Sequence, residues 1–220
     1  MKRSSLLLLL LVAPSALLEP RGASAQSCSA AVPHVEGQWQ TLPYRMPINP
    51  ISTTLLHDGR VLIVSGSEAD ASNNSKGSES YRIALWDPTG RTQASIVVDD
   101  LEYDVFCSGT AVLPDGRPLV VGGTSDYSFA GEARSSIYDP ARSGFLQTQD
   151  MADGRWYGTA TALGDGRIMA FSGLGLGGDT NSSVEIYDPS HPGSGWSSPV
   201  LAPFLPPVYP RMFLLPSGKV

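Results

Sequence analysis

No internal stretch of the sequence reaches the roughly 18 consecutive apolar residues that a membrane-spanning helix requires, so no transmembrane segment is predicted. Basic residues are also few: 15 Lys and Arg stand against 21 Asp and Glu, which gives a net charge of −6. Because nucleic-acid binding depends on neutralising phosphates, this acidic balance predicts no nucleic-acid partner. A hydrophobic content of 41% is nevertheless that of a globular protein.

Cysteine is rare, since the chain has only Cys28 and Cys107. Two cysteines in an exported protein can form a disulfide, and a free cysteine can also act as a small buried hydrophobic residue. Cys28 would lie close to the start of the mature chain, in a segment that is expected to be loose. A disulfide with Cys28 and a free thiol therefore both remain open for Cys107.

The N-terminus has the three parts of a secretory signal peptide. Lys2-Arg3 form a basic start, residues 6–12 an apolar core, and Ala23-Ser24-Ala25 a small-residue cleavage site. We expect residues 1–25 to be removed and the protein to be secreted, to the extracellular space or the periplasm. A lipid anchor on Cys28 is a weaker alternative, because the preceding residues form a poor lipobox.

Glycine and proline are abundant, with 23 and 18 residues, and they separate short apolar runs. This pattern favours an all-β chain. A turn motif recurs at intervals of about 50 residues, which is the period of kelch repeats, each a four-stranded blade of a β-propeller. The turns are Asp58-Gly59-Arg60, Asp115-Gly116-Arg117, Asp165-Gly166-Arg167 and Ser217-Gly218-Lys219.

The repeats predict the domain organisation. After the signal peptide, residues 26–50 lead into a partial kelch β-propeller over residues 51–220. About three and a half blades are present, so the chain is expected to be the N-terminal part of a longer protein with a ring of about seven blades. The blades cover about 51–100, 103–150, 155–200 and, cut short, 203–220.

Three residues occupy one slot in successive repeats, because Cys107, Tyr157 and Tyr209 each lie at the same distance before the turn glycine. In a propeller, this slot lies near the central axis at the start of an inner strand. A cysteine and a tyrosine on neighbouring inner strands suggest a joint chemical role.

The segments around these residues resemble the galactose oxidase and glyoxal oxidase family of copper-radical enzymes. The matching motifs are Asp104-Val105-Phe106-Cys107-Ser108-Gly109, Arg155-Trp156-Tyr157 and Tyr209-Pro210. The resemblance implies a thioether bond between Cys107 and Tyr157, with Tyr157 as a ligand of one copper ion. It also implies that the other ligands, a tyrosine followed by a histidine and a further histidine, lie beyond Val220.

The implied function is that of a secreted copper-radical oxidase, of which this chain is the N-terminal fragment. It would oxidise small aldehydes or primary alcohols, including carbohydrates, and reduce O2 to hydrogen peroxide. The alternative is a non-catalytic kelch propeller that binds carbohydrate or protein. Tyr209, Arg155 and Trp156 are candidates to line the substrate channel, although packing roles, or an ion pair for Arg155, would also explain them.

One departure from the family concerns protection of the radical. In galactose oxidase, a tryptophan from the loop after the tyrosine's blade turn stacks over the thioether. The corresponding loop here, Gly173 to Gly178, contains no aromatic residue. The sequence thus predicts no stacking partner from that loop.

Overall fold

The computed structural model describes residues 35, 37–69, 81–90, 96–126, 128–191 and 195–220. The chain divides into two compact units, Met1–Thr41 and Leu42–Val220, and the second unit contains the sheets. The predicted signal peptide and Cys28 lie outside the described residues. Among the residues that are described, no helix is long and apolar enough to cross a membrane.

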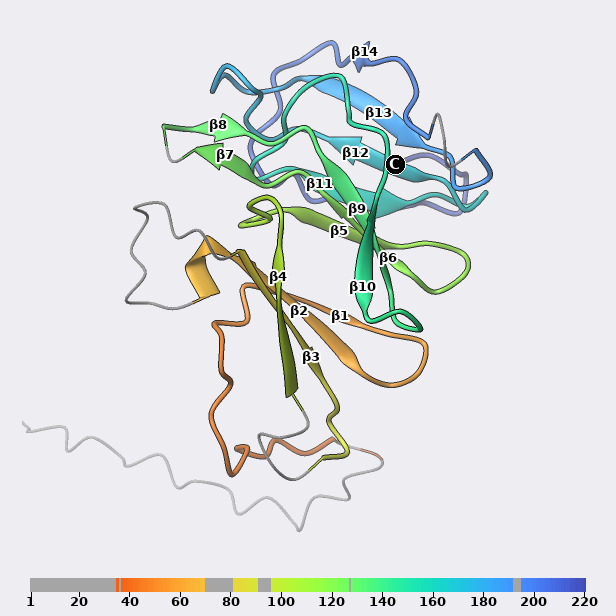
Figure 1. Ribbon diagram of the computed structural model, residues 1–220. Helices are drawn as coiled ribbons and strands as arrows, with labels where there is room; N and C mark the ends of the chain where they lie inside the picture. The colour runs from red at the N-terminus through yellow and green to blue at the C-terminus, as the bar shows by residue number, and fades with distance from the viewer. Residues whose placement is uncertain (1–34, 36, 70–80, 91–95, 127, 192–194) are drawn as a thin grey trace, which may run out of the picture. The chain divides into compact units, whose positions relative to one another are not determined.

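The described residues form three four-stranded antiparallel sheets and one two-stranded sheet (Figure 1). In each large sheet, the strands follow one another in chain order, as expected for propeller blades. The first sheet contains β1 (Ser52–Leu55), β2 (Val61–Gly66), β3 (Tyr81–Trp86) and β4 (Ile96–Leu101), and a short 3-10 helix, η1 (Ser67–Ala69), follows β2. The predicted all-β class is confirmed.

The second sheet contains β5 (Gly109–Val112), β6 (Pro118–Val121), β9 (Ser135–Asp139) and β10 (Gly144–Gln147). Between β6 and β9, the chain forms a separate hairpin of β7 (Thr124–Asp126) and β8 (Ala130–Gly131). The third sheet contains β11 (Thr159–Ala162), β12 (Ile168–Phe171), β13 (Ser183–Tyr187) and β14 (Val200–Leu201).

The apolar core lies between neighbouring sheets, and the second sheet contributes to both of its main clusters. Val120 packs with Leu62 and Val64 of the first sheet, whereas Leu119 and Val121 pack with residues of the third sheet. Strand β6 is therefore buried on both faces. This arrangement explains its continuous apolar sequence, which a strand with one solvated face would not need.

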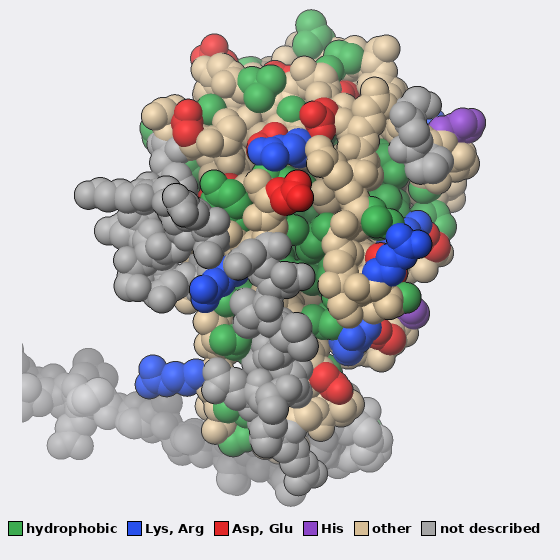
Figure 2. Space-filling model, viewed as in Figure 1, with side chains coloured by type: hydrophobic (Ala, Val, Ile, Leu, Met, Phe, Trp, Pro, Cys, Tyr) green, Lys and Arg blue, Asp and Glu red, His purple; other side chains and the backbone are tan. Residues whose placement is uncertain are grey.

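The repeated turns are built from the same local contacts. In the first three turns, the aspartate accepts a hydrogen bond from the arginine N–H two residues later and pairs with its guanidinium. The glycines of these three turns have φ between +85° and +88°, a conformation that glycine adopts without strain. Figure 2 shows basic side chains directly beside acidic ones on one face of the molecule.

The glycine pair after β6 fixes the segments that hold the candidate site. A Cβ atom on Gly122 would collide with the carbonyl oxygen of Arg155, and one on Gly123 with that of Asp104. The close approach allows Gly123 N–H to bond to Arg155 O at 3.3 Å and Thr124 N–H to Asp104 O at 3.0 Å. The segments that precede the inner strands β5 and β11 are therefore both hydrogen-bonded to the loop after β6.

Candidate functional site at the starts of the inner strands

The three slot residues are joined in a row by their backbones: Cys107 and Tyr157 precede the inner strands β5 and β11, and Tyr209 lies beside Tyr157. Tyr157 N–H donates to Cys107 O at 3.2 Å, and Tyr209 N–H donates to Tyr157 O at 2.7 Å. All three have positive φ, at +57°, +62° and +50° for Cys107, Tyr157 and Tyr209. For a residue with a side chain, this backbone costs about 1–3 kcal/mol, and such strain concentrates at functional sites.

The side chains of the same three residues also interact. The Tyr157 and Tyr209 rings have centroids 5.3 Å apart at an angle of 56°, and the Tyr209 hydroxyl donates to Cys107 O at 3.2 Å. The structure therefore brings together the cysteine and both tyrosines of the predicted slot.

Cys107 is half-buried, and within the described part of the chain its thiol is free. Burial raises the pKa of Cys107, and it likewise raises the pKa values of Tyr157 and Tyr209. These groups are consequently neutral at neutral pH unless a cation stabilises their charged forms. Cys28, the partner in the disulfide alternative, lies outside the described residues.

Trp156 stacks on the ring of Tyr157. Their centroids lie 4.5 Å apart with an interplanar angle of 17°, and Trp156 is only 3% exposed. Both residues precede strand β11, and the positive φ of Tyr157 explains how neighbours in sequence can stack.

The backbone of Trp156 pairs with the loop from Gly173 to Gly178, which contains no aromatic residue. Trp156 N–H donates to Leu174 O at 3.0 Å, and Leu174 N–H donates to Trp156 O at 2.6 Å. That loop therefore holds the backbone of the residue whose ring covers Tyr157. Sequence reasoning did not predict the stack, and the only available signal was the adjacency of the two aromatic residues.

Arg155 lies in the interior. Its guanidinium is 1% exposed and pairs with the fully buried Glu185 at 2.8 Å. It also donates to the carbonyl oxygens of Ser172 and Ser183, at 3.1 and 3.0 Å, and Glu185 accepts the N–H of Ala152 at 2.8 Å. This burial favours the structural alternative for Arg155 over substrate contact. Because Glu185 lies on strand β13, the ion pair holds the segment that precedes Tyr157 against this strand.

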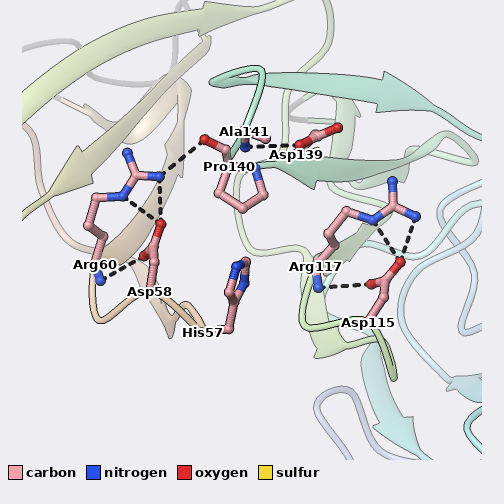
Figure 3. Close-up of a pocket in the computed structure, with 8 residues that line it drawn as sticks. All are labelled: His57, Asp58, Arg60, Asp115, Arg117, Asp139, Pro140 and Ala141. Carbon is pink, nitrogen blue, oxygen red and sulfur yellow. Dashed lines mark hydrogen bonds and ion pairs between the residues drawn. The ribbon is translucent and has the colours of Figure 1, made fainter.

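The two histidines that the structure describes, His57 and His191, do not contribute to the slot. His57 lines a shallow pocket between the turns of the first two sheets, where Asp58 pairs with Arg60 and Asp115 with Arg117 (Figure 3). His191 lies elsewhere, 3.2 Å from Asp188 on the surface. His34 is outside the described residues.

The donor set can be compared with the copper site that the resemblance implies. Phenolate oxygen is a suitable ligand for Cu(II), so the phenol oxygen of Tyr157 has the chemistry that a copper ligand needs. Among the described residues, no group of three or more His, Cys, Asp and Glu side chains could hold a metal ion. The described residues thus bring Cys107 and Tyr157 together without a cluster of such metal ligands around them.

Comparisons with known proteins agree with the resemblance, although no protein-family profile matches the chain. Galactose oxidase from Gibberella zeae is 28% identical over 146 residues, which cover 66% of this chain and 20% of that protein. Aldehyde oxidase GLOX from Vitis pseudoreticulata is 33% identical over 131 residues, which cover 53% of this chain and 22% of that protein. The matched part is about a fifth of the length of these relatives.

Among solved structures, a fungal alcohol oxidase of the AA5 family, in complex with copper, superposes with a TM-score of 0.56 at 23% identity. The match covers 70% of this chain and 31% of that one. It supports the fold, and the predicted partial kelch-type β-propeller is confirmed. The predicted resemblance to galactose oxidase and glyoxal oxidase is confirmed by the sequence relatives.

Proposed function

We propose that this chain forms the cysteine–tyrosine half of a copper-radical oxidase that converts alcohols or aldehydes with O2 into oxidised products and hydrogen peroxide. The observation that carries the proposal is the alignment of Cys107 with Tyr157 on neighbouring inner strands, joined by the 3.2 Å backbone hydrogen bond. The relatives named galactose oxidase and aldehyde oxidase support it.

In this proposal, Cys107 and Tyr157 become a single cofactor. A bond forms between Sγ of Cys107 and a ring carbon beside the phenol oxygen of Tyr157. The thiol hydrogen and the ring hydrogen are lost with two electrons, and O2 accepts both to become hydrogen peroxide. The thioether makes the tyrosine easier to oxidise by one electron.

The phenol oxygen of Tyr157 would hold the copper ion, together with ligands from residues beyond Val220. Bound copper would supply one-electron redox chemistry, so that the metal and the cross-linked tyrosine together accept the two electrons of the substrate. The chain's own residues orient and shield this tyrosine. Trp156 covers the ring, and the Arg155–Glu185 ion pair anchors the segment that carries it.

We also propose that the protein is exported by the signal peptide of residues 1–25, which would place it where O2 and small alcohols are available. N-terminal sequencing of the protein from the culture medium of its source would test this part. A mature protein that begins at Gln26 is the expected result, and an intracellular protein that retains Met1 would contradict it.

The proposed activity can be tested with the full-length protein after loading with Cu(II) in air. Addition of a primary alcohol or an aldehyde should produce hydrogen peroxide, measured with a peroxidase-coupled dye. Cys107→Ser and Tyr157→Phe should lose nearly all of this activity, whereas Tyr81→Phe, which alters a tyrosine of the first sheet, should keep it. Peroxide formation that survives both site substitutions would contradict the proposed site, and a copper-loaded, unsubstituted protein that forms no peroxide would leave the non-catalytic binding propeller as the alternative.

A further inference from the structure

Tyr209, the third residue of the slot, is hydrogen-bonded to both residues of the proposed cofactor. Its backbone N–H donates to Tyr157 O at 2.7 Å, and its hydroxyl donates to Cys107 O at 3.2 Å. The same carbonyl oxygen of Cys107 also accepts the N–H of Tyr157, at 3.2 Å. Three hydrogen bonds therefore join each of these residues to the other two.

The segment that carries Tyr209 is itself held on the third sheet. Ser172 Oγ donates to Pro207 O at 2.7 Å, and Thr159 Oγ1 of strand β11 donates to Pro210 O at 2.8 Å. The rings of Pro207 and Pro210 also fix their own φ angles, which leaves fewer conformations to the residues between them. Tyr209 is thus held by the sheet on both sides along the chain.

The hydroxyl of Tyr209 has a function that its ring does not explain. The ring lies against that of Tyr157, with centroids 5.3 Å apart at an angle of 56°, and a phenylalanine would make the same contact. The hydroxyl reaches further and bonds to Cys107, which lies 102 residues earlier in the chain. A tyrosine at this position therefore adds a direct link to the residue that has to react with Tyr157.

Formation of the thioether depends on how Cys107 is held. The new bond joins Sγ to one ring carbon of Tyr157, and an intramolecular reaction of this kind is fast only while the reacting atoms are held close together and aligned. Cys107 precedes strand β5 and has a φ of +57°, and the orientation of its backbone determines the direction of its side chain. A hydrogen bond to its carbonyl oxygen restrains that orientation.

We propose that Tyr209 is a positioning residue for the cross-link, because its hydroxyl holds Cys107 in the orientation from which Sγ bonds to the ring of Tyr157. The proposal rests on the proposed oxidase function and assigns Tyr209 a role other than substrate contact. The C–S bond forms as the S–H bond and the ring C–H bond break, and O2 takes up the two electrons and two protons as hydrogen peroxide. Tyr209 itself exchanges neither electrons nor protons.

The test follows cross-linking over time in the full-length protein after addition of Cu(II) in air. Peptide mass spectrometry measures the fraction of Cys107 that is joined to Tyr157 at each time point. Tyr209→Phe removes the hydroxyl and keeps the ring. It should slow cross-linking about 2- to 10-fold, the range expected for the loss of one hydrogen bond, and leave the urea midpoint of the copper-free protein unchanged.

Tyr187→Phe is the matched control. Tyr187 lies on β13, and its buried hydroxyl has no hydrogen-bond partner among the described residues. Its removal should leave the rate of cross-linking unchanged. A slower reaction at unchanged stability in Tyr209→Phe alone separates positioning of Cys107 from a general contribution to the fold.

Alkylation of the copper-free protein by iodoacetamide gives a second readout that does not depend on copper. Loss of the Tyr209 hydroxyl should release Cys107 and raise its rate of alkylation, measured on its own peptide, about 2- to 10-fold. Tyr187→Phe should alkylate at the original rate. An unchanged rate in Tyr209→Phe would mean that the hydroxyl does not restrain Cys107, which would overturn the proposal.

Cross-linking at the original rate in the folded Tyr209→Phe protein would also overturn the positioning role. If that variant instead needs more substrate for half-maximal peroxide formation, Tyr209 contacts substrate and the oxidase function stands. An unsubstituted, copper-loaded protein that never forms the thioether rejects the oxidase function and the positioning role together.

Discussion

Trp156 and Tyr157 are adjacent in the chain and yet stack face to face, with ring centroids 4.5 Å apart. The left-handed backbone of Tyr157, at φ +62°, accounts for this arrangement. The protein thereby covers its candidate redox tyrosine with the residue beside it, and the loop from Gly173 to Gly178 provides the backbone partner of Trp156.

We expect Trp156→Ala to be strongly destabilising. Removal of a buried large aromatic side chain leaves a cavity and costs about 3–5 kcal/mol of unfolding free energy. Urea unfolding followed by circular dichroism would measure the loss. Trp39→Ala is the matched control, because Trp39 is fully exposed and its substitution should change the unfolding free energy by less than about 0.5 kcal/mol. Equal effects of the two substitutions would show that Trp156 is not packed as described.

The buried Arg155–Glu185 ion pair gives a second prediction. Glu185→Ala leaves the arginine charge buried without its carboxylate and should cost about 3–5 kcal/mol of unfolding free energy. Asp165→Ala breaks the ion pair with Arg167 in the exposed turn of the same sheet, and it should change the stability very little, because solvent screens an exposed pair. Differential scanning calorimetry of both variants would compare them. A Glu185→Ala protein as stable as Asp165→Ala would mean that Arg155 can reach solvent, which would restore it as a substrate-contacting candidate.

Gly123 gives a third prediction, about the loop that ties the two strand entrances together. Its φ is +135°, and a Cβ atom there would collide with the carbonyl oxygen of Asp104. Gly123→Ala should therefore displace the Cys107 segment and destabilise the fold by more than about 1 kcal/mol. Gly177→Ala is the control, since its Cβ would meet open space without a positive φ, and its effect should be close to zero. A Gly123→Ala protein with unaltered urea unfolding would contradict the close packing of this loop.

Much of the fold follows from the sequence because its determinants are local. The turns at Gly59, Gly116 and Gly166 require glycine at positive φ and an aspartate that caps the turn, and both features are visible in the repeat. The continuous apolar run of β6 also predicts burial on both faces. The shared position of Cys107 and Tyr157 follows from the period alone.

The features that the sequence did not reveal depend on tertiary contacts. The stacking of Trp156 on Tyr157 depends on the positive φ of Tyr157, which has no sequence marker. Whether Arg155 is buried depends on Glu185, which is distant in the chain and lies on β13.

Peptide mass spectrometry of the full-length protein, loaded with Cu(II) in air and digested with trypsin, tests the central claim most directly. Cys107 falls in the tryptic peptide of residues 92–134 and Tyr157 in that of residues 156–167, because trypsin does not cleave between Arg117 and Pro118. The account predicts one species with the combined mass of the two peptides less two hydrogens, absent from Cys107→Ser. Separate, unmodified peptides after copper treatment would contradict it.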